Sequence, residues 1–187
     1  MSKAGLAQAN ALADRFAEEL AEERIERLVS SDLGRARQTA RPIAARLGIP
    51  IELVPGLRER NYGIFEGLTY GEIERDYPEE YASLTRRDPA YVIPGGESGG
   101  GFRTRVLDAL ERVASTHAET RVAVVTHGGV LGVLYRCAMK LPVDAERSYS
   151  LANASINRVR FAFGSWVIER WGDVTHLADV AADDPVD

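Results

Sequence analysis

Three short stretches of the 187-residue sequence combine residue types that can handle a phosphate group. The stretch 31–40 contains Arg35, the stretch 57–69 contains Glu59, and the stretch 124–129 contains His127 followed by two glycines. A guanidinium, an imidazole and open backbone amides can bind phosphate oxygens, and a carboxyl group can protonate a departing alcohol. Phosphoryl chemistry is therefore the simplest joint interpretation of the three stretches.

Arg35 follows an apolar run, residues 25–30, and a Ser-Ser-Asp turn. Helical spacing of the apolar residues over 35–47 places this arginine in the first turn of a helix, where free amides and the helix dipole favour an anion. Arg37 lies about 200° around the same helix at roughly 100° per residue, so we expect it to face elsewhere. The alternative is that both arginines are solvated surface charges.

His127 follows Val122–Val125, a continuous apolar run typical of a strand covered on both faces. We expect this strand to be the most buried one and to lie at the centre of the fold. Gly128 and Gly129 leave the backbone open at the start of an apolar helix, residues 130–139, so the Gly128 amide can bind substrate. The alternative is a core histidine whose ring is satisfied by a backbone carbonyl.

Glu59 lies in a loop rich in arginine and glycine, residues 57–69. Nearby arginines would lower the pKa of its carboxyl group and partial burial would raise it, so the sequence leaves its role as an acid open. Arg60 and Tyr62 are candidate substrate-binding residues at the entrance, because they lie close to Glu59 in the chain. Surface ion pairing is the alternative for each charge in this loop.

The remaining histidines and the cysteine do not suggest a metal site. His117 falls on the polar side of a predicted helix end and His176 follows a predicted hairpin. No two histidines stand at metal-ligand spacing, and Cys137 is the only cysteine. We therefore predict a protein without metal or other cofactor. A single cysteine cannot form a disulfide within the chain, so the sequence does not require an oxidising compartment.

The pattern along the chain predicts an α/β fold, a three-layer sandwich with a largely parallel sheet. Expected helices cover residues 6–20 (capped by Ser2), 35–47, 69–77 (capped by Thr69 and Glu72, ended by Pro78), 102–113 and 130–139; expected strands cover 25–30, 51–54 and 122–125, with a hairpin over 156–171. The stretch 94–101 is too glycine-rich for a regular element. We expect one domain, residues 1–180, and a frayed tail, residues 181–187.

The composition excludes several classes of partner. Acidic residues outnumber basic ones by 28 to 23, giving a net charge of -5, and no basic stretch could neutralise a row of phosphates, so we predict no nucleic-acid partner. No apolar run is long enough to span a membrane, and the amino terminus lacks the pattern of a signal peptide. We predict a cytoplasmic protein that binds a small phosphorylated metabolite, and a homodimer is compatible with the sequence.

Taken together, the motifs resemble the histidine phosphatase superfamily, or phosphoglycerate mutase-like family. The matching pieces, in the family's order, are SDLGRARQTA (31–40), LRERNYGIFEG (57–67), PGGES (94–98), VVTHGG (124–129) and NASIN (153–157). The resemblance implies that a histidine attacks phosphorus and that water or a second hydroxyl then takes the phosphoryl group. It also implies that Arg35 and His127 bind the phosphate oxygens and that Glu59 is the proton donor and acceptor.

The sequence departs from the family at one point. The family's nucleophile lies in an Arg-His-Gly motif after the first strand, and this sequence contains no such motif. We expect the first strand and the nucleophile loop to be missing through a misassigned start codon or a shortened sequence. The alternatives are a degenerate relative that binds a phosphate ligand without turnover, or a reaction in which His127 itself is the nucleophile.

The resemblance favours a phosphatase that hydrolyses a small phosphomonoester through a phosphohistidine intermediate. The short spacing between Glu59 and His127 resembles the phosphatase branches more than the mutases, which carry an added segment there. The alternatives are a phosphotransferase of the phosphoglycerate mutase type and a non-catalytic pseudoenzyme that binds a phosphometabolite.

Overall fold

The computed structural model describes residues 1–18 and 24–180 and contains two separate sheets. Three parallel strands lie in the order β2-β1-β3, and an antiparallel hairpin is formed by β4 and β5. The strands are β1 (Arg27–Ser30), β2 (Ile51–Leu53), β3 (Val122–Val125), β4 (Ile156–Ala162) and β5 (Ser165–Asp173). The expected α/β class is confirmed.

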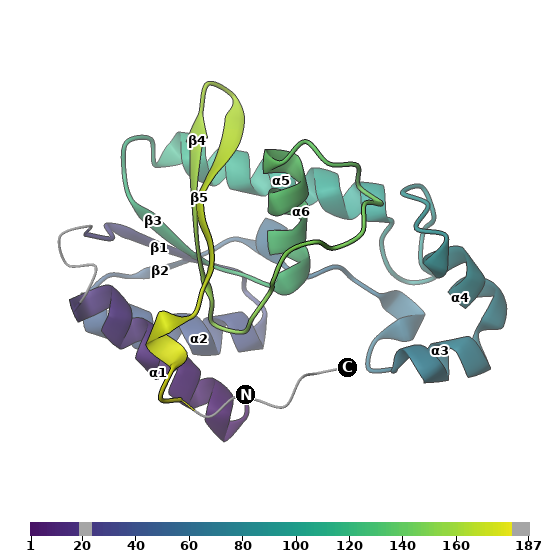
Figure 1. The fold of residues 1–187 in the computed structure, drawn as a ribbon, viewed down its shortest axis with the longest axis horizontal. Helices are drawn as coiled ribbons and strands as arrows, with labels where there is room; N and C mark the ends of the chain where they lie inside the picture. Colours follow the sequence, from purple (N-terminus) through teal and green to yellow (C-terminus); the bar gives the residue numbers. More distant parts are fainter. Residues whose placement is uncertain (19–23, 181–187) are drawn as a thin grey trace.

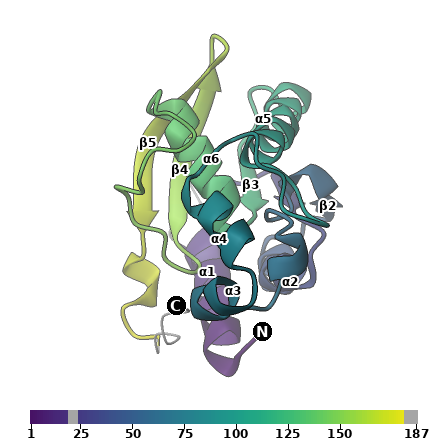
Figure 2. The ribbon, with the colours of Figure 1, turned by 90° about the vertical axis from the view of Figure 1, so that its right-hand side faces the viewer.

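Helices cover both faces of the parallel sheet (Figure 1). They are α1 (Lys3–Glu18), α2 (Gly34–Leu47), α3 (Tyr70–Asp76), α4 (Pro78–Thr85), α5 (Gly99–Thr116) and α6 (Gly128–Ala138). On one face, Leu12 of α1 and Ile43 of α2 share a buried cluster with Leu28 of β1. On the other face, helices α5 and α6 enclose Val29. Figure 2 shows the β4–β5 hairpin and β2 at opposite sides of the molecule.

The expected signals at helix ends are present as hydrogen bonds. Ser2 Oγ accepts from the Gly5 amide at 3.0 Å and so caps α1. Thr69 and Glu72 form a reciprocal capping box at the start of α3. Local capping signals in the sequence therefore predict where these two helices begin.

Two boundaries differ from the expectation. The helix expected from residue 102 begins at Gly99, because Ser98 Oγ accepts from the Gly101 amide at 2.9 Å and this cap outweighs the poor helix propensity of three glycines. Pro78 does end α3, but it also starts α4, because proline fits the first turn of a helix.

Leu6, which was expected to face the core, is 51% exposed. Leu20 and the tail 181–187 lie outside the described residues.

The predicted position of β3 at the centre of the fold is wrong. Among the described residues β3 pairs only with β1 and β4 pairs only with β5, so β1 is the central strand of the parallel sheet. Leu28, Val29 and Ser30 of β1 are buried, whereas Ala123 is the single buried residue of β3. The apolar run of β3 reflects helices on both of its faces and carries no information about its neighbours within the sheet.

Candidate functional site

Arg35 and His127 meet at the carboxyl ends of β1 and β3. Arg35 Nε donates to His127 Nδ1 at 3.1 Å, and His127 Nε2 lies 2.8 Å from the hydroxyl of Ser31, which directly follows β1. A guanidinium N–H can only donate, so Nδ1 is the acceptor and the neutral ring carries its proton on Nε2, which donates to Ser31. Two of the predicted site residues therefore share one hydrogen-bonded cluster, and the sequence analysis missed the serine that completes it.

His127 is uncharged at neutral pH. His127 is 7% exposed. This burial is the main cause that lowers the pKa of the imidazole to about 4, and the charge of Arg35 is the second cause. The charge of Asp32 acts in the opposite direction. A phosphate placed beside this ring would favour its protonated form, because an opposite charge nearby stabilises the imidazolium.

Glu59 is fixed against the first turn of α6. Its Oε2 accepts from the Gly129 amide at 2.9 Å, and its Oε1 accepts from the Arg60 amide at 2.8 Å. A Cβ atom at position 129 would overlap Glu59 Oε1, so glycine is required for this approach. The third predicted residue therefore lies against the helix that begins directly after His127.

An arginine from α5 holds the Glu59 loop in place. Arg105 donates to the carbonyl oxygens of Gly56 at 2.9 Å and Arg58 at 3.1 Å, and it pairs with the carboxylate of Glu97. Glu97 in turn accepts from the Asn61 amide at 2.8 Å. Glu97 lies in the motif PGGES, for which no role was predicted, and Arg105 was not predicted because it lies too far along the chain from the loop to give a local signal.

A second ion pair borders the cluster and was also missed. Arg58 Nε donates to Asp32 Oδ1 at 2.7 Å, and its Nη2 donates to Oδ2, an arrangement that binds the carboxylate at both oxygens. These bonds hold the pKa of Asp32 below its usual value. Asp32 follows Ser31 directly, so the pair ties the Glu59 loop to the end of β1.

Arg60, Tyr62 and Gly128 lie close to Glu59 or to the start of α6. The Arg60 guanidinium stands 5.5 Å from the centre of the Tyr62 ring. Burial raises the pKa of Tyr62, and the charge of Glu59 acts in the same direction. Gly128 is the first residue of α6, whose N-cap, His127, makes no side-chain capping bond. The geometry is compatible with substrate binding by these three residues, and their roles stay predictions.

The other two histidines lie away from this cluster. His117 Nε2 is 3.2 Å from Glu52 Oε2, and His176 Nε2 is 3.1 Å from the carbonyl oxygen of Ala154. Within residues 1–18 and 24–180, no three His, Cys, Asp or Glu side chains gather in a group that could hold a metal ion. No helix in that part of the chain is long and apolar enough to cross a membrane.

The fold matches several solved structures. Bacillus stearothermophilus YhfR superposes with a TM-score of 0.82 at 26% identity, covering 95% of this chain and 86% of that one. A mycobacterial glucosyl-3-phosphoglycerate phosphatase, solved with inorganic phosphate, superposes with a TM-score of 0.77 at 28% identity and covers 94% of this chain and 88% of that one.

Curated relatives have higher sequence identity. A metal-independent phosphoserine phosphatase of Arabidopsis thaliana is 40% identical over 182 residues, which is 96% of this chain and 74% of the relative. A probable phosphoglycerate mutase of Erwinia tasmaniensis is 36% identical over 165 residues, 86% of this chain and 77% of the relative. Residues 1–174 also match the sequence model of the histidine phosphatase superfamily, branch 1. The chain belongs to the histidine phosphatase superfamily, branch 1.

Proposed function

We propose that this chain acts in the hydrolysis of a small phosphomonoester without a metal. The observation that supports the proposal is that Arg35 bonds to the His127 ring, while Glu59 accepts from the amide of Gly129, two residues after His127. Arg35, the His127 ring and the Gly128 amide bind the phosphate oxygens, and Glu59 exchanges protons with the leaving alcohol. The names of the relatives support phosphorylated metabolites as substrates, since they include a phosphoserine phosphatase and a glucosyl-3-phosphoglycerate phosphatase.

The reaction then follows the family scheme in two steps. A histidine of the family's Arg-His-Gly segment, which residues 1–187 do not contain, attacks phosphorus through a ring nitrogen, the bond from phosphorus to the ester oxygen breaks, and Glu59 gives its proton to that oxygen. Water next attacks the phosphohistidine, the phosphorus–nitrogen bond breaks, and Glu59 takes a proton from the water. Arg35 and the α6 amides stabilise the negative charge on the phosphoryl oxygens in both steps.

His127 is a phosphate ligand in this proposal and is not the nucleophile. The Nδ1 lone pair accepts from Arg35 and is not free to attack phosphorus, whereas the N–H on Nε2, which donates to Ser31 here, is a donor that a phosphate oxygen can accept from. In the family scheme the attacking histidine belongs to an Arg-His-Gly segment, which residues 1–187 do not contain. This absence is the one observation that favours the second candidate, a pseudoenzyme that binds a phosphometabolite without turnover.

Trapping of labelled phosphate tests the proposal. The 187-residue chain, mixed with a ³²P-labelled phosphomonoester and quenched, should form no acid-labile phosphoenzyme, and the chain joined to an Arg-His-Gly segment should form one and release phosphate. The same extended chain carrying Glu59→Gln should lose most of its turnover. Label on His127 would overturn its assigned role, and an extended chain that binds phosphate but never forms phosphohistidine would favour the pseudoenzyme.

A further inference from the structure

The bond between Arg35 and His127 can exist only while the His127 ring is uncharged. Arg35 Nε donates to the lone pair of Nδ1 at 3.1 Å, and the proton of the neutral ring lies on Nε2, which is 2.8 Å from the hydroxyl of Ser31. A second proton on the ring would occupy Nδ1, so two N–H groups would then face each other. Protonation of His127 therefore requires that the Arg35 guanidinium find another acceptor.

Burial and a neighbouring charge favour the neutral form of the ring. His127 and Ser31 are both buried. Burial, and after it the positive charge of Arg35, lower the pKa of the His127 ring to about 4. Near neutral pH the protein thereby avoids two positive charges side by side.

We propose that His127 makes the site selective for doubly charged phosphate groups over singly charged anions. When a dianion binds, Nδ1 of the ring takes up one proton from solvent, and the Arg35 Nε–H passes from the ring to an oxygen of the anion. The imidazolium then offers an N–H on each ring nitrogen, and it shares the negative charge with the guanidinium. This inference rests on the proposed function, which places the phosphate beside Arg35 and His127.

The charge of the anion decides whether the ring is protonated. One opposite charge within about 4 to 6 Å raises the affinity of a group for a proton by about tenfold to a thousandfold, and a second charge multiplies the effect. To charge the ring at neutral pH, its affinity for a proton must rise about a thousandfold, because its pKa is about 4. A dianion reaches this increase more readily than a monoanion of the same shape. A phosphomonoester dianion therefore meets two positive charges, whereas a singly charged anion meets one.

Glu59 is a second titratable group beside this cluster. Its carboxylate accepts from the Gly129 amide at 2.9 Å, two residues after His127. Asp32 is bound at both oxygens by Arg58, which holds the pKa of Asp32 below its usual value, so Asp32 stays ionised near neutral pH. A test of the inference must therefore separate proton uptake by the ring from proton uptake by Glu59.

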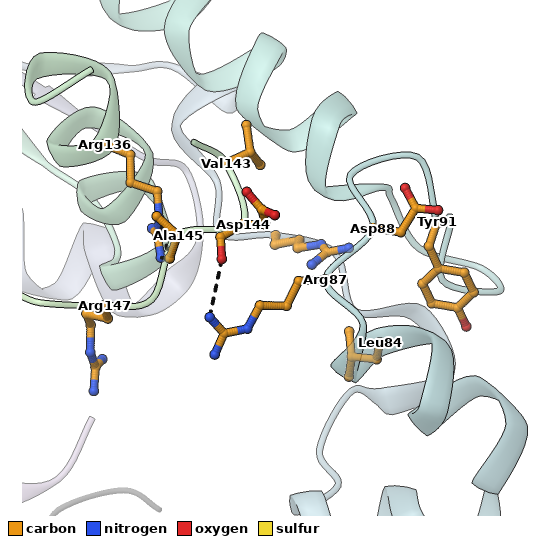
Figure 3. A pocket seen from close by; sticks show the side chains of 10 residues that line it. Leu84, Arg87, Asp88, Tyr91, Arg136, Val143, Asp144, Ala145 and Arg147 are labelled. Carbon is orange, nitrogen blue, oxygen red and sulfur yellow. Dashed lines mark hydrogen bonds between the residues drawn. The ribbon is translucent and has the colours of Figure 1, made fainter. Parts of the chain in front are cut away.

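A group of arginines outside this cluster supplies a matched control. Arg87, Arg136 and Arg147 line a cavity of about 200 Å³ between the end of α4 and the segment that follows α6 (Figure 3). Arg87 donates to the carbonyl oxygen of Asp144, and in the part of the chain that the structure describes none of the three arginines bonds to the His127 ring. Removal of Arg87 thus takes away one positive charge without taking a bond from the ring.

Tungstate and perrhenate test the inference, because these tetrahedral oxyanions have the same shape and carry two and one negative charges. Calorimetry of the Glu59→Gln chain, repeated near neutral pH in buffers of different ionisation enthalpy, should show uptake of close to one proton per tungstate. The double variant Glu59→Gln/His127→Gln should take up almost none. Tungstate affinity should fall by about tenfold for each unit by which the pH rises near neutrality, because binding takes up a proton. Perrhenate should bind more weakly, without this uptake.

Nitrogen NMR of the ¹⁵N-labelled 187-residue chain gives a second readout that needs no substitution. The two ring nitrogens of His127 should have the unequal shifts of a neutral ring before tungstate is added and the similar shifts of an imidazolium afterwards. Without tungstate, Arg35→Met should raise the pKa of the ring, because it removes both the donor to Nδ1 and a positive charge. Arg87→Met should leave that pKa unchanged.

The possible outcomes separate this inference from the proposed function. A His127 ring that stays neutral with tungstate bound would overturn the inference and leave the phosphate site standing. Equal proton uptake with tungstate and perrhenate would also overturn it, because the ring would then not respond to the charge of the anion. Failure of orthophosphate and tungstate to bind would count against the proposed function itself, and the inference would fall with it.

Discussion

Gly129 decides whether Glu59 can reach α6, because only a residue without Cβ leaves space for the carboxylate. We expect Gly129→Ala to destabilise the protein by about 1 kcal/mol, since loss of a charged hydrogen bond, worth about 1.5 to 3 kcal/mol, exceeds the gain in helix propensity of up to about 1 kcal/mol. Urea denaturation measures the change. Gly71→Ala, in a helix where an added Cβ meets open space, is the matched control and should be neutral or slightly stabilising.

His127 makes the stability of the protein depend on pH. Its pKa is about 4 in the folded protein and about 6.5 in an unfolded chain, so the unfolded chain binds more protons between these values. The contribution is fully present above pH 6.5 and is lost as the pH falls toward 4, by up to about 3 kcal/mol. Denaturation of the protein and of His127→Gln across this range measures it.

Burial also lowers the pKa of His176, so this second histidine makes stability depend on pH in the same direction. His176 is present in both proteins, and the difference between the parent and His127→Gln therefore isolates the contribution of His127. We expect the variant to lose less stability than the parent between pH 7 and pH 4. Parallel curves for the two proteins would contradict the assignment.

Residue types identified the parts of the site, and spacing alone could not assemble them. Arg35, Glu59 and His127 were predicted from their positions near strand ends; the structure bonds Arg35 to His127 and Glu59 to the Gly129 amide, and their roles stay predictions. Ser31 and Arg105 were missed because their partners lie far away in the chain and neither residue type is distinctive at its position. The neutral state of His127 was equally beyond the sequence, since it follows from burial in the fold.

At the scale of elements, the loop that carries Glu59 is positioned by α5 and not by its own sequence. Arg105 bonds to the carbonyl oxygens of Arg58 and Glu59 in this loop and of Gly56 directly before it. We expect Arg105→Met to increase amide exchange over residues 57–61 at least tenfold, because the loop loses these bonds and the pairing with Glu97. Hydrogen exchange read by mass spectrometry or NMR measures this.

Arg103→Met is the matched control for that experiment, because it removes an arginine from the same helix outside this network. Unchanged exchange in the Arg105 variant would show that the loop is held by other contacts. The expectations for elements were correct at the caps of Ser2 and Thr69, and they missed the cap of Ser98, which three glycines follow. They were wrong for β3, whose place in the sheet depends on partners distant in the chain.

At the scale of the whole molecule, the hairpin is joined to the rest through the core and not through the parallel sheet. Ile156 of β4 is 8% exposed and belongs to the buried cluster that includes Leu12, Leu28 and Ile43. We expect Ile156→Ala to lower the free energy of unfolding by about 2 to 4 kcal/mol, because it leaves a cavity at this junction. Chemical denaturation measures the loss.

Val167→Ala removes an apolar side chain that is 41% exposed on the same hairpin, and it should cost less than about 1 kcal/mol. Similar losses for the two variants would mean that Ile156 does not anchor the hairpin to the core.

The α/β class could be predicted from alternating patterns, whereas the division into two sheets could not, because pairing between distant strands is not encoded in local periodicity.

A crystal structure with tungstate, a stable mimic of phosphate, tests most directly whether the three separated stretches form one oxyanion site. We expect a single tungstate within hydrogen-bond distance of the Arg35 guanidinium, the His127 ring and the Gly128 amide, with the Glu59 carboxyl beside it. Tungstate bound elsewhere at saturating concentration, with Arg35 and His127 still bonded only to each other and to Ser31, would contradict it.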